Sequence, residues 1–219
     1  MFRQYREIKK GEFFVIFADT SSGGSDSNAC QFLSKTMIDV PLVYHQRGIA
    51  TEMTNAIFPV IEKIFDVTGI KPMVAYENNA GGIFELERLA ALNRSNKYSI
   101  YKQITHGTTQ SEQTEKIGWV TNTATRPLML QDLKNAIDNK LLRVYDKQTV
   151  GELYSFIINR LGKPEAEQGS HDDLVMSLAG AWQLYQQCDT PPTDEGFSNE
   201  FPNDVLFNDT EVGSEISIN

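Results

Sequence analysis

The sequence predicts an α/β protein with one mixed β-sheet flanked by helices. The first observation is a continuous apolar run at 13–18, which suits a central strand buried on both faces. The second is that β-rich segments at 29–33 and 37–46 follow with short gaps, so these three strands should form an antiparallel meander. The third is that helical and extended patterns alternate after residue 51, which favours parallel strands in the rest of the sheet.

The middle of the chain is expected to alternate between helix and strand. Apolar residues at helical spacing predict a helix over 51–67, although Pro59 should kink or divide it. A short apolar strand is predicted at 71–77. Gly81-Gly82 then leads into a second helix, whose apolar positions recur at helical spacing.

The second half should contain one more strand, a hairpin and three helices. The strand is predicted at 98–104, and an irregular extra β-hairpin is expected over 107–123. Pro127 fits the first turn of a helix. Thr149-x-x-Glu152 is a candidate capping box for a helix that continues to Leu161, and the last helix is predicted from 173 to 187.

Length and composition indicate one globular domain with a tail. The 219 residues suit a single domain, and no apolar run is long enough to span a bilayer. We expect a linker at 1–12, a folded body at 13–187 and a disordered acidic tail at 188–219. The amino terminus lacks a signal peptide, so a cytosolic setting is expected. Two cysteines are too few for a disulfide framework and are not spaced for zinc.

The net charge of −9 is distributed unevenly along the chain. Eight of the 29 acidic residues and none of the 20 basic residues lie within 188–219, so the remainder carries 21 acidic and 20 basic residues. A near-neutral body can still hold a basic groove. Composition alone therefore does not predict a nucleic-acid partner.

Acidic residues stand where predicted strands end or a helix begins. Asp19 follows the first strand, Glu77 follows the fourth, and Asp172-Asp173 open the last helix. Strand ends meet at one edge of an α/β sheet, and carboxylates gathered there repel one another unless a cation lies between them. Mg²⁺ and Mn²⁺ prefer oxygen ligands, and two such ions about 3.5–4 Å apart can clamp the attacking and leaving oxygens of a phosphodiester. The pattern therefore indicates metal-dependent phosphoryl transfer.

Four sequence motifs make this interpretation more specific. They are Phe14-Val-Ile-Phe-Ala-Asp19, Tyr76-Glu77-Asn78-Asn79-x-Gly81, Gly118-Trp119-x-Thr121 and Ser170-His171-Asp172-Asp173-Leu174-Val175-Met176. In this order they resemble the nuclease motifs of the large terminase subunit of tailed bacteriophages, across roughly 13–187. The resemblance implies a ribonuclease H-like sheet, two Mg²⁺ or Mn²⁺ ions, and an endonuclease that cuts concatemeric double-stranded phage DNA during packaging, largely without sequence specificity.

The same resemblance assigns roles to individual acids. Asp19 corresponds to the bridging metal ligand, Glu77 to the second carboxylate, and Asp173 to the ligand on the last helix. Asp172 and His171 are further candidate metal ligands, and the adjacent aspartates leave the choice between them open. Each acid also has a structural explanation, because aspartate is common in turns and acidic side chains favour helix starts.

The resemblance also implies partners and a location. The family's nuclease works with a portal protein and a small terminase subunit in the host cell cytoplasm, without a membrane. No Gly-x-x-x-x-Gly-Lys-Ser/Thr loop occurs in the sequence, so the family's ATPase domain is absent from this chain, and a split gene and a fragment both fit. For phosphate contacts we expect Lys116 on the hairpin, Arg126 beside the next helix, and Lys102.

Two other functions remain open at this point. A Holliday-junction resolvase or another ribonuclease H-like nuclease would share the acidic layout but cut branched DNA or a hybrid. A non-catalytic module that docks on portal or DNA would use the same carboxylates only as caps and turn residues. Cleavage of junction, duplex and hybrid substrates separates the first alternative, and metal titration separates the second.

Overall fold

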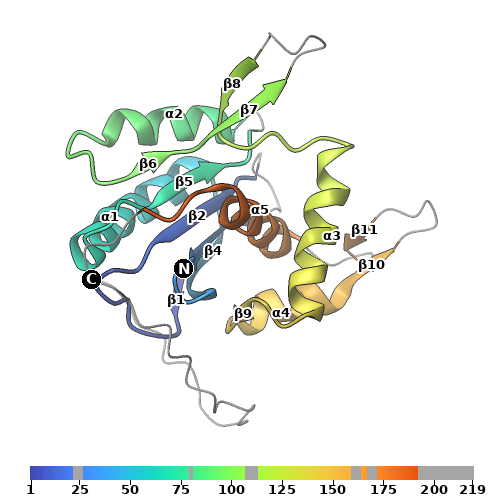
Figure 1. The fold of residues 1–219 in the computed structure, drawn as a ribbon. Coiled ribbons are helices and arrows are strands. Elements are labelled where there is room, and N and C mark those ends of the chain that lie inside the picture. Colours follow the sequence, from blue (N-terminus) through green and yellow to red (C-terminus); the bar gives the residue numbers. More distant parts are fainter. Residues whose placement is uncertain (22–26, 79–80, 107–112, 159–163, 167–171, 192–219) are drawn as a thin grey trace.

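The centre of the molecule is a mixed β-sheet (Figure 1). The computed structural model describes residues 1–21, 27–78, 81–106, 113–158, 164–166 and 172–191. Within these residues the sheet has seven strands in the order β1-β4-β3-β2-β5-β6, with β9 also paired to β4. Its strands are β1 (Phe2–Gln4), β2 (Phe14–Asp19), β3 (Ser27–Ser34), β4 (Asp39–Arg47), β5 (Met73–Tyr76), β6 (Ser99–Ile100) and β9 (Arg143–Val144).

The pairing agrees with the mixed sheet that the sequence predicts. β2, β3 and β4 form an antiparallel meander, and β5 and β6 then add in parallel on the other side of β2. β2 is therefore a central strand, and five of its six residues are buried. Its apolar side chains alternate between the two faces, which explains why the run reads as continuously hydrophobic.

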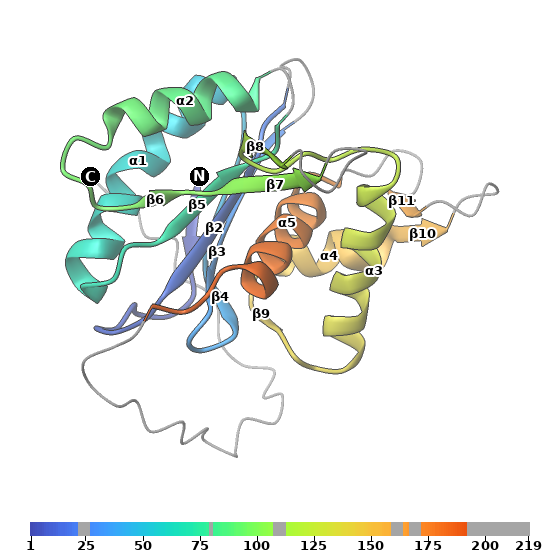
Figure 2. The same ribbon diagram turned by 45° about the horizontal axis from the view of Figure 1, so that its top comes forward.

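Helices cover both faces of the sheet (Figure 2). They are α1 (Ala50–Thr68), α2 (Gly82–Leu92), α3 (Thr125–Asp138), α4 (Lys147–Ser155) and α5 (Asp173–Gln187). Phe14 and Ile16 pack with α1 and α2 in one core, whereas Val15 and Phe17 pack with α3 and α5 in the other. Removal of both apolar faces from water is the main stabilising contribution to this arrangement.

Among the described residues, two small hairpins lie outside the main sheet. β7 (Lys102–His106) pairs with β8 (Gln113–Ile117), and this hairpin projects away from the body (Figure 1). β10 (Phe156–Ile158) pairs with β11 (Pro164–Ala166) after α4. The expected strand at 98–104 is therefore divided between the sheet and the first hairpin, and the expected helix to Leu161 ends at Ser155.

Two expectations about helices are corrected by the structure. Pro59 lies inside α1, which runs as one element, so the predicted division is wrong. The proposed capping box at Thr149 is also wrong, because α4 begins at Lys147 and the preceding residue, Asp146, caps it through its side chain. The Asp146 carboxylate accepts from the Thr149 N–H at 2.8 Å and from its hydroxyl at 2.7 Å. The Glu152 side chain therefore does not cap its own helix, α4.

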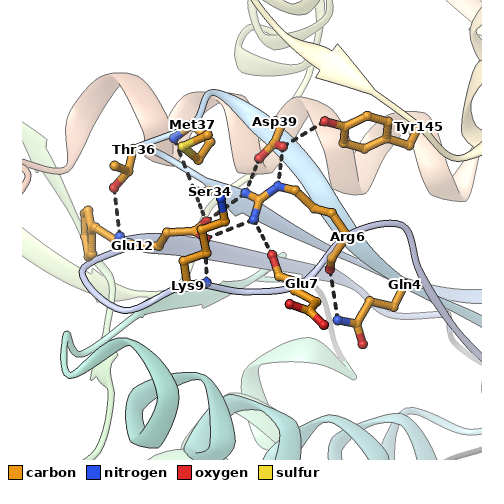
Figure 3. A network of polar contacts seen from close by, with 11 residues as sticks. Gln4, Arg6, Glu7, Lys9, Glu12, Ser34, Thr36, Met37, Asp39 and Tyr145 are labelled. Carbon is orange, nitrogen blue, oxygen red and sulfur yellow. Dashed lines mark hydrogen bonds and ion pairs between the residues drawn. The ribbon is translucent and has the colours of Figure 1, made fainter. Parts of the chain in front are cut away.

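Residues 1–12, expected to be a linker, are joined to the sheet. β1 pairs antiparallel with β4, and Arg6 enters a polar network beneath it (Figure 3). Its guanidinium donates to Asp39 at 2.6 Å and to Glu12 at 2.7 Å, and both carboxylates are almost fully buried. A charge-assisted network of this kind is costly to break on one side, because the remaining carboxylate would stay buried and unpaired.

The folded core extends to the residue that follows α5. Cys188, assigned to the tail by its composition, is buried in the core beside α5, and the Lys35 ammonium donates to its carbonyl. The remaining tail from 192 to 219 lies outside the described residues. Within the described part of the chain, every helix is too short or too polar to cross a membrane.

Candidate metal-binding and catalytic site

Asp19 and Glu77 are brought together by the parallel pairing of β2 and β5. Ala18 lies opposite Tyr76 in the register, so the next residue on each chain segment, Asp19 at the end of β2 and Glu77 just after β5, reaches the same edge of the sheet. The Glu77 N–H donates to the Ala18 carbonyl at 2.9 Å. The crevice outside such strand ends is the usual ligand site in α/β sheets, as the sequence predicted.

The Gly118-Trp119 motif fixes the backbone on the other side of Glu77. Trp119 forms a parallel bridge with Glu77, and its N–H donates to the Tyr76 carbonyl at 2.9 Å. Gly118 has φ +75°, and a Cβ there would lie 2.7 Å from the Tyr76 carbonyl oxygen. Glycine is therefore required for the close approach that holds the end of β5.

Helix α5 brings the third part of the site against β2. Its middle passes directly over Phe17, because Gly180 has no side chain to hold the helix away. At its start, the Asp173 carboxylate accepts a hydrogen bond from the Ser27 N–H at 3.3 Å, which connects the helix to the beginning of β3. Asp173 thus contacts β3, the strand that pairs with the Asp19-bearing strand β2.

The adjacent aspartates have separate contacts. The Asp172 carboxylate pairs with the Arg126 guanidinium of α3 at 2.5 Å, whereas Asp173 contacts β3. The sequence left the choice between these two acids open. The contacts favour Asp173 as the residue that belongs with Asp19, and they place Asp172 at the side of the site.

The carboxylates interact strongly with one another. Burial raises the pKa of Asp19 well above its usual range, and the negative charges of Glu77, Asp173 and Asp172 raise it further. A hydrogen bond between the Asp19 and Glu77 carboxyl groups adds to this shift, since such a bond requires one proton between them. The three other predicted acids therefore lie within electrostatic reach of Asp19.

This donor set suits a hard divalent cation. Carboxylate oxygens are the ligands that Mg²⁺ and Mn²⁺ prefer, and a cation would relieve the repulsion that now favours a proton. As the side chains stand, the described residues contain no group of three or more His, Cys, Asp or Glu arranged at metal-ligating distances. Among the described residues, the acids thus interact with one another without forming a complete set of metal ligands.

A fifth carboxylate, Glu152, was not predicted as part of this region. It lies on α4 and accepts hydrogen bonds from the Leu174 and Val175 N–H groups at the start of α5. Only the fold reveals this contact, because helix periodicity does not show which helix a side chain will cap.

The remaining predicted residues are only partly placed. Lys102 and Lys116 are exposed on the β7–β8 hairpin, and Lys102 pairs with Glu115 at 3.1 Å. Arg126 is engaged by Asp172 beside the acidic site. His171 lies outside the described residues.

Several solved structures of similar architecture are viral terminase nuclease domains. The sequence matches no protein family and no curated protein. The large terminase nuclease of thermophilic phage G20c with bound magnesium is 18% identical, with TM-score 0.58 over 84% of this chain and 85% of that one. The large terminase nuclease domain of Thermus phage P74-26 is 17% identical, with TM-score 0.54 over 85% of each. The manganese-soaked human cytomegalovirus terminase nuclease domain is 13% identical, with TM-score 0.53 over 82% and 84%.

These likenesses establish the fold. At such low identity they show a shared chain path, in which a mixed sheet is covered by helices on both faces. The chain has the ribonuclease H-like fold of terminase nuclease domains, and the predicted fold class is confirmed.

Proposed function

We propose that this protein is a divalent-metal-dependent DNA endonuclease that cuts viral DNA during genome packaging. The observation that carries the proposal is the meeting of Asp19, Glu77 and Asp173 at one edge of a ribonuclease H-like sheet. The likeness to terminase nuclease domains supports the substrate and the biological setting. Because one fold can host many functions, the site residues carry more weight for the proposal than the shared fold does.

Three side chains would hold the metal ions. These are Asp19, Glu77 and Asp173, whose carboxylate charges already interact in the folded protein. With divalent ions bound at these residues, the site would supply an activated water and charge stabilisation for the leaving 3′ oxygen of a phosphodiester, as two-metal sites do. Asp172 would stay at the edge of the site while Arg126 holds it. His171 is a proposed further metal ligand.

DNA would be bound through its phosphates. Lys116 and Lys102 on the projecting hairpin and Arg126 on α3 are the proposed contacts. Such contacts position the duplex without reading its sequence, so cleavage would be largely nonspecific and would weaken with salt. A portal protein and a small terminase subunit are the proposed partners, in the host cell cytoplasm.

The test is cleavage of supercoiled plasmid with Mg²⁺, Mn²⁺ or EDTA. Wild-type protein should cut with either metal and not with EDTA. Asp19→Asn and Asp173→Asn should abolish cutting while the protein stays folded, because each removes a ligand charge from the site. Asp138→Asn is the matched control, since Asp138 is exposed and paired with Lys134 at the far end of α3, and it should cut normally.

The outcome also separates the alternatives. Preferred cleavage of a four-way junction or an RNA–DNA hybrid over duplex would favour a resolvase or another ribonuclease H-like enzyme. Duplex binding without metal binding or cleavage would favour a docking module. Either result would contradict the proposal.

A further inference from the structure

The first turn of α5 is capped by a different helix. The residue before the helix, Asp172, makes no side-chain hydrogen bond to the helix start. Instead, Glu152 of α4 accepts from the Leu174 N–H at 2.9 Å and the Val175 N–H at 3.2 Å, both through Oε2. These N–H groups have no partner within the helix, and they are the ones that a local cap would normally bind.

Asp172 is not available for capping because of its other contact. Its carboxylate is held by Arg126 of α3 at 2.5 Å. Asp173, the first helical residue, contacts the Ser27 N–H at 3.3 Å. Three carboxylates therefore meet at this helix start, and each has a distinct partner from a different element.

The location of Glu152 is electrostatically unfavourable. Burial raises the pKa of Glu152 to about 7, and repulsion from Asp173 and Asp172 adds to the shift although both N–H donors oppose it. Glu152 is therefore close enough to the site for its charge to interact with the acids there. Glu152 is also partly buried in its contact with α5, so its position is fixed by packing as well as by hydrogen bonds.

We propose that Glu152 is a positioning residue for the metal site: its carboxylate fixes the first turn of α5 and so holds Asp173 against β2 and β3. The inference rests on the proposed metal-dependent function of Asp19, Glu77 and Asp173. Outer contacts that orient ligands commonly decide metal affinity, because a misdirected carboxylate cannot complete the coordination shell. Glu152 itself touches neither substrate nor metal in this proposal.

The experiment compares Glu152→Ala with Glu152→Gln in the whole chain without DNA. Alanine removes both hydrogen bonds, whereas the glutamine amide oxygen can accept both. Glu152→Ala should raise the Kd for Mn²⁺, measured by calorimetry, on the order of tenfold. It should also speed hydrogen exchange at the Leu174 and Val175 amides, followed by NMR. Glu152→Gln should stay near wild type in both measurements.

Ile61→Val controls for a general loss of stability. Ile61 is a fully buried residue of α1, in the core on the opposite face of the sheet, so losing one methyl there should lower the Tm without touching α5. Its Kd for Mn²⁺ should equal that of the wild type. This control separates a positioning role from a merely structural one, since only positioning links the amide exchange to metal affinity.

Several outcomes would overturn the inference. Wild-type Mn²⁺ affinity in Glu152→Ala would show that the cap does not position Asp173. Equal losses in the alanine and glutamine variants would show that the charge matters rather than the hydrogen bonds, and Glu152 would then be a ligand. If Glu152→Ala does not fold, Glu152→Asp replaces it: the carboxylate is one methylene shorter and cannot reach both N–H groups, so the Kd for Mn²⁺ should rise, and an unchanged Kd would overturn the inference. Wild-type protein that neither binds Mn²⁺ nor cuts plasmid would instead contradict the proposed function, and the inference with it.

Discussion

Gly180→Ala tests whether close packing of α5 on β2 sets the geometry of the site. A Cβ at this position would lie 2.3 Å from Phe17 Cε1 and 2.4 Å from two further ring carbons. Ordinary carbon contacts lie near 3.5–4.0 Å, so the helix or the ring must move by roughly 1 Å. The Phe17 ring is 1% exposed and has no free space to enter, so we expect the helix to move.

The magnitude follows from two opposing terms. Overpacking of a core costs about 1–3 kcal/mol, and replacing a helical glycine by alanine returns about 0.5–1 kcal/mol. The net loss of about 1–2 kcal/mol should lower the Tm by roughly 2–8 °C in a protein of this size. Asp173 lies seven residues away, about 10 Å along the helix axis. A shift of about 1 Å there should reduce kcat by as much as about 100-fold.

The assay combines thermal unfolding, Mn²⁺ titration and plasmid cleavage. Gly151→Ala is the matched control, because Gly151 is also helical but a Cβ there meets nothing within 4 Å. This variant should gain about 0.5–1 kcal/mol of stability and cut normally. Adding Phe17→Leu to Gly180→Ala should recover part of the lost metal affinity. If Gly180→Ala is as stable and active as Gly151→Ala, close packing of α5 does not set the site geometry.

Three further predictions concern pH, the glycine motif and DNA contact. The pKa values of Asp19 and Glu152 are raised in the folded state, so the metal-free folded protein binds protons more tightly than the unfolded chain does. Its free energy of unfolding should therefore fall as pH rises from about 4.5 to about 7. Chemical denaturation across that range checks this, and Asp19→Asn should flatten the slope, whereas an unchanged slope would contradict it. Gly118→Ala should destabilise the protein by about 1–3 kcal/mol and weaken Mn²⁺ binding, because an alanine at φ +75° is strained and its Cβ would lie 2.7 Å from the Tyr76 carbonyl oxygen. Calorimetry measures the Mn²⁺ affinity, and a wild-type value would refute the prediction. Lys116→Gln should lower the slope of log affinity for duplex DNA against log salt concentration by about 1. Lys102→Gln should lower this slope less, because Lys102 already pairs with Glu115. Equal slopes in the two variants would count against these contacts.

Much of the fold was encoded in local patterns. The apolar run at 13–18 predicted a strand buried on both faces, and β2 is such a strand. The last helix was predicted over 173–187 and has those bounds. Periodicity determines these elements because burial of one or both faces repeats at fixed spacing along the chain. The positions of Asp19 and Glu77 at strand ends follow directly from the same patterns.

Other features depended on contacts between distant segments. The first residues looked like a polar linker, yet Arg6 pairs with buried acids, one of them 33 residues away. Charge pairs of this kind leave no periodic trace, because a lysine- and arginine-rich segment looks the same in solvent and against a buried carboxylate. Pro59 likewise did not divide α1, because packing of its buried face can outweigh local propensity.

The sequence by itself determined which acids could gather at the edge of the sheet, because strand ends and helix starts are readable from local pattern. Only the tertiary structure decided how those acids divide their contacts. Asp172 pairs with Arg126 of α3, Asp173 contacts β3, and Glu152 of α4 caps α5. The physical reason is that a carboxylate accepts from whichever donors the packing of helices brings within about 3 Å, and that packing is a property of the whole fold.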